Sequence, residues 1–204
     1  NAAIHYSRAF FLLIDMGLDP NFVPAGHQGA VSTLLIGMLN EPVREYLIEN
    51  EEYVVVIADL ERALNFADRL PAGTITRLLA RAKFDLNDKT NSGNSLIFSA
   101  VAAESDAHAQ AVAELIEAGL KIDVRDKQLN MPPLFRVRSE AMLRVLVAAG
   151  VDINMPGPQG LTFREHLEAQ FRSTGNRDPE AQSPLMATLY PVLDELGAEN
   201  ADPE

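Results

Sequence analysis

The sequence predicts an all-α fold in which short helix-turn-helix pairs repeat along the chain and stack into a solenoid. Three recurring patterns predict it: a leucine four residues before a glycine, an Asp-centred tetrapeptide soon after, and a turn followed by a helix start. Such a helix pair is too small to bury its own apolar face, so it has to stack on its neighbours. We therefore expect one repeat domain over residues 1–204, with about five helix pairs.

The first pattern is the word Leu-apolar-x-x-Gly. It occurs as LIDMG, LIEAG and LVAAG, and in looser form as LIENE, LLARA and LDELG; the six words begin at Leu13, Leu115, Leu146, Leu47, Leu78 and Leu193. In chain order these leucines lie 34, 31, 37, 31 and 47 residues apart, so they follow a common period. We expect all six to be buried between repeats. Gly119 and Gly150 should end their helices with a positive φ, which glycine adopts without a steric penalty.

The second pattern follows four of these six words, and the third follows three of them. The tetrapeptides LDPN, FDLN, IDVR and VDIN occupy residues 18–21, 84–87, 122–125 and 151–154. Turn sequences rich in Gly, Pro and Asn then lead to Ser, Thr or Pro, as in NSGNS (91–95), NMPP (130–133) and PQGLT (158–162). These residue types favour the first turn of a helix, by capping it or because proline's missing N–H is not needed there.

Together these words resemble the ankyrin repeat, a unit of about 33 residues with a Thr-Pro-Leu-His start. The segment LVAAGVDINMPG (146–157) is similar to the family's helix end and finger, and LIEAGLKIDVRD (115–126) is similar with one additional residue. PPLF (132–135) is similar to its start, with Phe135 in place of His. The resemblance is strong over residues 75–163 and weaker, though in phase, elsewhere. No unit retains the His, and we expect Phe98 and Phe135 to replace its hydrogen bond by packing.

The expected helices follow from these signals in chain order. They cover residues 7–17, 30–39, 42–50, 51–70, 73–82, 95–103, 107–119, 133–137, 139–150, 161–171 and 184–197. Over 53–70 the apolar residues recur at a helical period, which favours a helix over a strand at 53–56. A polar insertion at 172–183, rich in Gly and Pro signals, accounts for the longest interval between leucines.

Composition excludes several classes of protein. The net charge of −12 and a pI near 4.7 argue against nucleic acid as a partner. The absence of cysteine excludes disulfides, thiolate metal sites and a cysteine nucleophile. No apolar run approaches the length of a membrane span, so no membrane partner is expected. A cytoplasmic monomer is favoured; a periplasmic or secreted location stays open if a signal sequence has been removed.

One basic cluster departs from the acidic background. Residues 121–144 hold six of the 17 basic residues but only three acidic ones. Because the resemblance implies that fingers and first helices line a concave face, the candidate partner-binding residues are Arg125, Lys127, Arg136 and Arg138. They would attract a partner that is acidic at the contact. The alternative is that they form salt bridges with the protein's own carboxylates.

The resemblance implies a non-catalytic module that binds a partner protein through its concave face and fingers. An immunity or inhibitor protein that neutralises a toxin or enzyme is one alternative. A hydrolase or metal-dependent enzyme that uses Glu165 and His166, or Asp106 and His108, is another. No catalytic, cofactor-binding or metal-binding motif is present, so no catalytic residue, cofactor or metal is expected.

Overall fold

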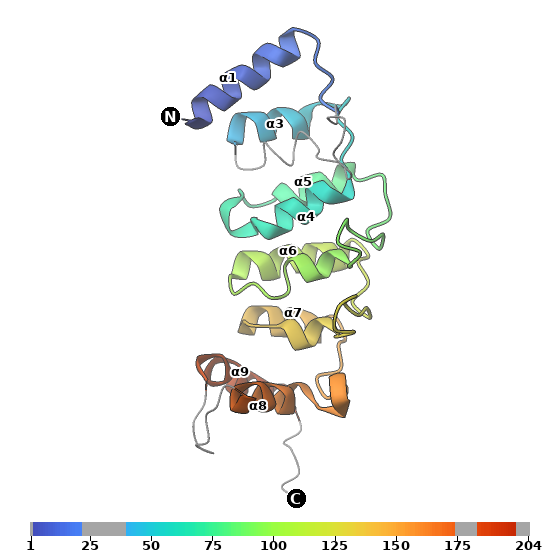
Figure 1. Cartoon of the computed structure of the whole chain (residues 1–204), viewed down its shortest axis with the longest axis vertical. Helices are drawn as coiled ribbons and strands as arrows, with labels where there is room; N and C mark the ends of the chain where they lie inside the picture. The colour runs from blue at the N-terminus through green and yellow to red at the C-terminus, as the bar shows by residue number, and fades with distance from the viewer. Residues whose placement is uncertain (1, 22–39, 174–182, 199–204) are drawn as a thin grey trace, which may run out of the picture. The chain divides into compact units, whose positions relative to one another are not determined.

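The computed structural model describes residues 2–21, 40–173 and 183–198, and every regular element in these ranges is helical (Figure 1). There are eight α-helices and four short 3₁₀ helices, and no strand occurs in these ranges. The prediction of an all-α fold is therefore confirmed. The expected helix at 30–39 lies outside the described residues.

Contacts along the chain group it into two compact units, Asn1–Leu96 and Ile97–Glu204. The expectation of a single domain over 1–204 stays a prediction. Within the described parts of both units, no helix is both long and apolar enough to cross a lipid bilayer.

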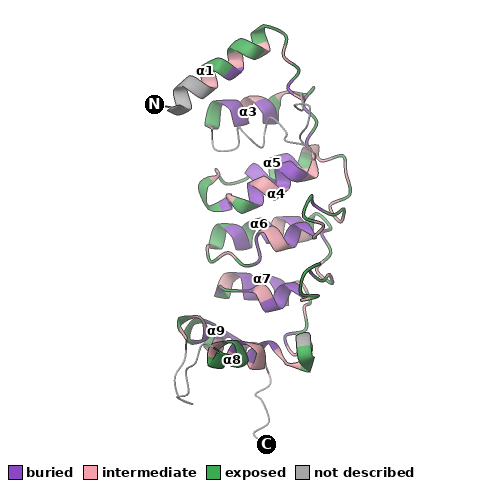
Figure 2. Cartoon of the chain, viewed as in Figure 1, coloured by how far each residue is buried: buried purple, intermediate pink, exposed green. Residues whose placement is uncertain are grey.

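The N-terminal unit is built from two packed pairs of helices. Its elements are α1 (Ala2–Asp15), α3 (Glu41–Glu49), α4 (Ile57–Asn65), η1 (Ala67–Arg69) and α5 (Thr74–Arg81). α1 packs on α3 and α4 packs on α5. Their facing sides are apolar and buried (Figure 2), as at Leu47, Leu60 and Leu78, none of which is exposed.

The expected helix over 51–70 is wrong in its first part and in its end. Residues 53–56 form neither helix nor strand, α4 begins only at Ile57, and it ends at Asn65 before the 3₁₀ turn η1. The buried carboxylate of Asp59 is the physical reason for the start. It accepts hydrogen bonds from the Val56 N–H and the Tyr53 hydroxyl, both at 2.9 Å, and so fixes the first turn of α4 at this point.

In the described part of the C-terminal unit, three short 3₁₀ helices each precede a longer α-helix. Its elements are η2 (Leu96–Ser99), α6 (Asp106–Glu117), η3 (Pro133–Arg136), α7 (Glu140–Ala148), η4 (Pro158–Gly160), α8 (Phe163–Ser173) and α9 (Pro184–Glu195). α6 packs on α7, α8 on α9, α7 on α9, and η3 on α8. Of the insertion expected at 172–183, Arg172 and Ser173 belong to the last turn of α8 and Ser183 precedes α9, while residues 174–182 lie outside the described residues.

The expected helices at 95–103 and 133–137 are single 3₁₀ turns in the structure. At residues 133–137 the sequence does not allow a longer helix. Pro132 and Pro133 cannot supply backbone N–H groups, and Ser139 already caps α7 by accepting a hydrogen bond from the Met142 N–H at 3.3 Å. Phe135 is nonetheless buried and packs edge-on against Phe163, with ring centres 5.7 Å apart.

The glycine-terminated words end their helices by one repeated hydrogen-bond pattern. At each end, the glycine N–H donates to the carbonyl three residues earlier, and the next N–H donates to the carbonyl five residues earlier. The first bond joins Gly17 to Ile14, Gly119 to Ile116, Gly150 to Val147 and Gly197 to Asp194. The second joins Leu18 to Leu13, Leu120 to Leu115, Val151 to Leu146 and Ala198 to Leu193. This is the Schellman arrangement, which requires a left-handed residue after the helix. Gly119 and Gly150 have φ of 101° and 94°, so that prediction is confirmed.

Five of the six leucines, at positions 47, 78, 115, 146 and 193, are completely buried, as expected. The expectation for Leu13 is wrong, because its side chain is 47% exposed. α1 contacts Tyr46 of α3 through the rings of Phe10 and Phe11. Leu13 lies roughly 110° around the helix from the midline of these two rings, given about 100° per residue, and so faces away from α3.

α3 has no glycine after its last turn, and an arginine takes over the capping. The guanidinium of Arg81 donates hydrogen bonds to the carbonyl oxygens of Leu47 (2.9 Å), Ile48, Asn50 (2.6 Å) and Tyr53 (2.7 Å). These are carbonyls at the helix C-terminus and just beyond it, which have no partner within the helix and carry partial negative charge. Arg81 comes from α5, and three of these four contacts span more than 30 positions in the chain. A distant side chain therefore does for α3 what Gly150 does locally for α7.

Candidate functional site

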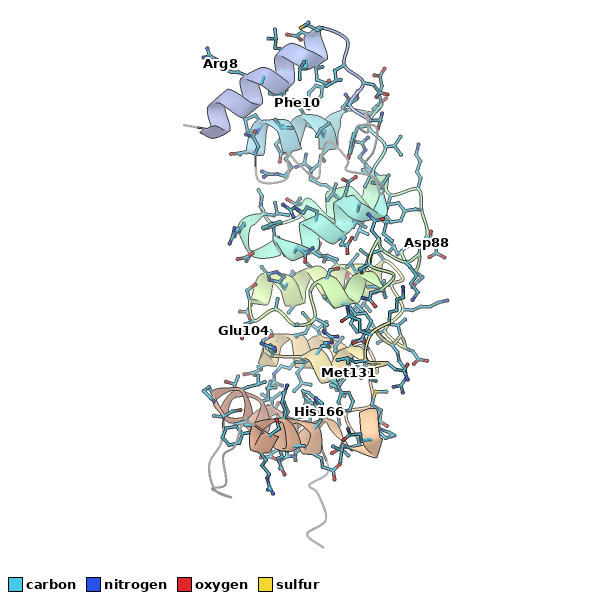
Figure 3. All side chains as sticks on the ribbon, viewed as in Figure 1. Arg8, Phe10, Asp88, Glu104, Met131 and His166 are labelled. Carbon is cyan, nitrogen blue, oxygen red and sulfur yellow. The ribbon has the colours of Figure 1, made fainter. Side chains whose placement is uncertain are left out.

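A groove in the C-terminal unit is the candidate site, and we call it the η3–α8 groove. It has a volume of about 220 Å³ and lies between the loop before η3, η3 itself, and the facing sides of α8 and α9. Met131 and His166, both labelled in Figure 3, line it from the loop and from α8. Its apolar lining is Leu129, Met131, Phe135, Val137, Leu167 and Leu185, and its polar lining is Arg136, Arg138, His166 and Gln170.

Asp126 holds the loop of the groove in place. Its carboxylate is buried and accepts hydrogen bonds from Arg136 Nη2 at 2.5 Å, from Arg136 Nε at 3.1 Å and from the Leu129 N–H at 2.5 Å. Its own N–H donates to the Met131 carbonyl at 3.0 Å. Burial alone would raise the pKa of Asp126, but these hydrogen bonds lower it below its ordinary value. The carboxylate is therefore ionised at neutral pH and fixes both Arg136 and the backbone of Leu129.

The four candidate residues divide between several places. Arg136 and Arg138 line the η3–α8 groove. Arg125 lines a second pocket of about 310 Å³, which lies between the tetrapeptides at 122–125 and 151–154, and its Nη1 donates to the Asn130 carbonyl at 3.0 Å. Lys127 is exposed on the loop and lines neither pocket. The structure thus brings Arg136 and Arg138 together, and the binding role of all four stays a prediction.

The charges of the two groove arginines differ. Arg136 is bound by the Asp126 carboxylate, so its charge is largely neutralised. Arg138 is exposed and forms no ion pair with any residue that the structure describes. The positive charge that the groove presents to a ligand at neutral pH is therefore mainly that of Arg138.

Leu129 was not among the sequence-based candidates, and His166 was considered only as a residue of the enzymatic alternative. Leu129 is 58% exposed at the rim of the groove. Its signal was a single large apolar residue in the polar stretch RDKQLN, residues 125–130. The His166 ring packs edge-on against Phe135 with ring centres 5.3 Å apart, and partial burial lowers its pKa below the ordinary value. It is therefore mostly neutral at neutral pH. No local pattern in the sequence indicates this contact.

The residues of the enzymatic alternative are engaged in helix starts or in packing. The Glu165 carboxylate accepts hydrogen bonds from the Thr162 N–H at 2.6 Å and from its hydroxyl at 2.9 Å, which lowers the pKa of Glu165. Near the start of α6, His108 Nδ1 lies 2.5 Å from the Ser105 hydroxyl, and its side chain is buried. Across the described ranges, no three side chains of the metal-binding types gather into one group.

The Asp-centred tetrapeptides share a local geometry. In three of them the N–H two residues after the Asp donates to its carboxylate: Asn21 to Asp19 at 2.8 Å, Asn87 to Asp85 at 2.9 Å and Asn154 to Asp152 at 2.9 Å. Within its own unit, Asn21 also bridges to backbone groups of Glu52 and Val54 at 2.9 and 2.8 Å. The recurring words therefore correspond to one recurring turn.

Comparison of the chain with models of known protein families finds no match. Comparison with curated protein sequences finds none either.

Proposed function

We propose that this protein is a divergent ankyrin-like repeat protein without catalytic activity, and that it binds a partner protein at the η3–α8 groove. The repeated helix ends, the repeated Asp-centred turns and the short 3₁₀ helices that precede α6, α7 and α8 support the repeat architecture. The groove is lined by the loop and the short first helix of one repeat and by α8 of the next repeat. In an ankyrin-like architecture, these elements belong to the concave face.

The observation that carries the binding proposal is the composition of the groove rim. Leu129 is 58% exposed and lines the same groove as Arg138, which has no ion pair among the described residues. Interface centres combine apolar anchors with arginine, because both gain most when water is excluded from them. The groove supplies this combination in a rigid frame fixed by Asp126.

Site-specific photo-crosslinking in the source cell tests the proposal. A benzophenone amino acid replaces Gln170, which is exposed and lines the groove, or Gln110, an exposed glutamine on α6 that does not line it. We expect protein adducts of defined mass from position 170 that excess wild-type protein competes away, and none of these from position 110. Equal adducts from both positions, or none from 170, would refute binding at the groove.

A further inference from the structure

We propose that the η3–α8 groove takes a short acidic segment of its partner, with one large apolar side chain in the groove and a carboxylate on Arg138. This inference rests on the proposed function and adds the chemistry of the partner to it. It is carried by an exposed leucine, an apolar cavity and an arginine without an ion pair among the described residues, all within one unit.

The cavity fits one large apolar side chain. An apolar cavity of about 150 Å³ accepts benzene, and the groove measures about 220 Å³. Met131, Phe135 and Leu167 supply apolar walls, and Leu129 stands at the rim. Because the Leu129 N–H is fixed to the Asp126 carboxylate at 2.5 Å, little backbone freedom of the loop is lost when a ligand covers Leu129.

The charges around the cavity select the sign of the ligand. The chain has 29 acidic residues, yet among the described residues no carboxylate side chain lines this groove. Asp126 lies behind it and is already engaged by Arg136. The guanidinium of Arg138 is planar and presents paired N–H groups that match a carboxylate. A basic segment would meet Arg138 with no compensating charge in the groove, so we infer an acidic one.

Peptide selection on the full-length chain tests this inference. Random heptapeptides displayed on phage are selected on immobilised protein, and enriched sequences are synthesised with a fluorescent label for anisotropy. We expect one Leu, Ile, Met or Phe with Asp or Glu within three positions. Arg138→Glu should weaken binding by about fivefold or more, and Leu129→Ser by about tenfold. Lys127→Glu makes the same charge change in the loop before η3 without lining the groove, and should change affinity less than about twofold.

All three substituted side chains are exposed, so the variants should keep the fold, which circular dichroism checks. Enriched peptides without acidic residues, unchanged affinity in Arg138→Glu, or equal enrichment on the Leu129→Ser chain would each overturn the inference. If Leu129→Ser abolishes binding of peptides that are not acidic, the groove still binds protein segments, and only the assigned chemistry fails. Loss of the crosslinks from position 170 would instead remove the proposed function itself.

Discussion

The ends of α1 and α7 carry the same backbone device in different surroundings. Both helices finish with Leu-x-x-x-Gly, and at both the two N–H groups after the helix donate to the same relative carbonyls. Yet Leu146 is completely buried, whereas Leu13 is 47% exposed. The pentapeptide therefore specifies the helix end by itself, but the burial of its leucine depends on what packs against the helix.

The end of α3 shows the reverse case, in which the leucine is buried but the glycine at the helix end is absent. Leu47 is completely buried, although the word LIENE has Glu51 where four of the other five copies have glycine. Here the helix end is satisfied by Arg81 from α5 rather than by a left-handed residue. A repeat can thus lose its local signal when a neighbouring helix supplies the missing hydrogen bonds.

The largest expected effect comes from truncating the leucines. Leu146→Ala and Leu47→Ala should each lower the free energy of unfolding by about 3 kcal/mol, because each leaves a cavity in a packed core. Leu13→Ala should change it by less than about 0.5 kcal/mol, since the side chain is half exposed. Urea unfolding followed by circular dichroism measures all three. A loss at Leu13 as large as that at Leu47 would show that Leu13 is buried in solution.

The next effect concerns the arginine cap. Arg81→Met should destabilise the N-terminal unit by about 2 kcal/mol, because it removes charged hydrogen bonds to several carbonyls at once. Hydrogen exchange of the α3 amides should accelerate. Arg77→Met is the matched control on the same helix: its ion pair with Glu45, at 2.6 Å, is partly exposed and should contribute less than about 1 kcal/mol.

A second substitution sharpens this result. Glu51→Gly in the Arg81→Met background restores the glycine of the other words and should recover part of the lost stability, whereas alone it should gain little. Equal losses for Arg81→Met and Arg77→Met would contradict the capping role of Arg81.

A smaller effect is expected at the glycines. Gly150→Val and Gly17→Val should each cost about 1 kcal/mol, because a Cβ opposes positive φ. The two costs should be similar, since at either position an added Cβ meets no atom within 4 Å and the strain is purely local. Asparagine at the same positions should cost less, as it tolerates this conformation. Thermal unfolding measures both, and a large cost at only one site would mean that the two helix ends differ.

Local signals in the sequence predicted the helices of the fold better than its packing. Gly119, Gly150 and Ser139 act within a few residues of their own position, so their roles can be read from short words. The exposure of Leu13 and the start of α4 depend on partners that the words do not contain. The helical period over 53–70 gave no indication that the buried carboxylate of Asp59 would delay the start of the helix to Ile57.

At the candidate site, too, the sequence predicted local features better than contacts with distant residues. A count of charges placed Arg136 and Arg138 in one cluster, and both line one groove. The same count could not show that Asp126 binds Arg136, or that Arg125 lines a different pocket. The position of His166 in this groove was not predicted, because its environment comes from Phe135, 31 residues earlier in the chain.

The pKa values of Glu165 and His166, adjacent residues of α8, show the same contrast between local and distant effects. Hydrogen bonds from the N–H and then the hydroxyl of Thr162, three positions away, lower the pKa of Glu165. Burial lowers the pKa of His166, and the Phe135 ring is part of that surrounding. The first effect is local and the second is made by neighbours, so each should respond to a different substitution.

The smallest expected effects are therefore two separate pKa increases in an NMR titration, each at a different residue. Phe135→Leu should raise the pKa of His166 toward its ordinary value and leave that of Glu165 unchanged. Thr162→Val, which keeps the backbone donor, should raise the pKa of Glu165 in part and leave that of His166 unchanged.

In the wild type both pKa shifts make the unfolded chain bind more protons than the folded one, so stability falls on acidification. The His166 contribution is lost first, as the pH falls through the ordinary histidine range toward the lowered pKa. The Glu165 contribution is present above the ordinary glutamate pKa and is lost as the pH falls through the lowered one. If Phe135→Leu shifts Glu165 as strongly as His166, the separation between local and neighbour-made effects does not hold in α8.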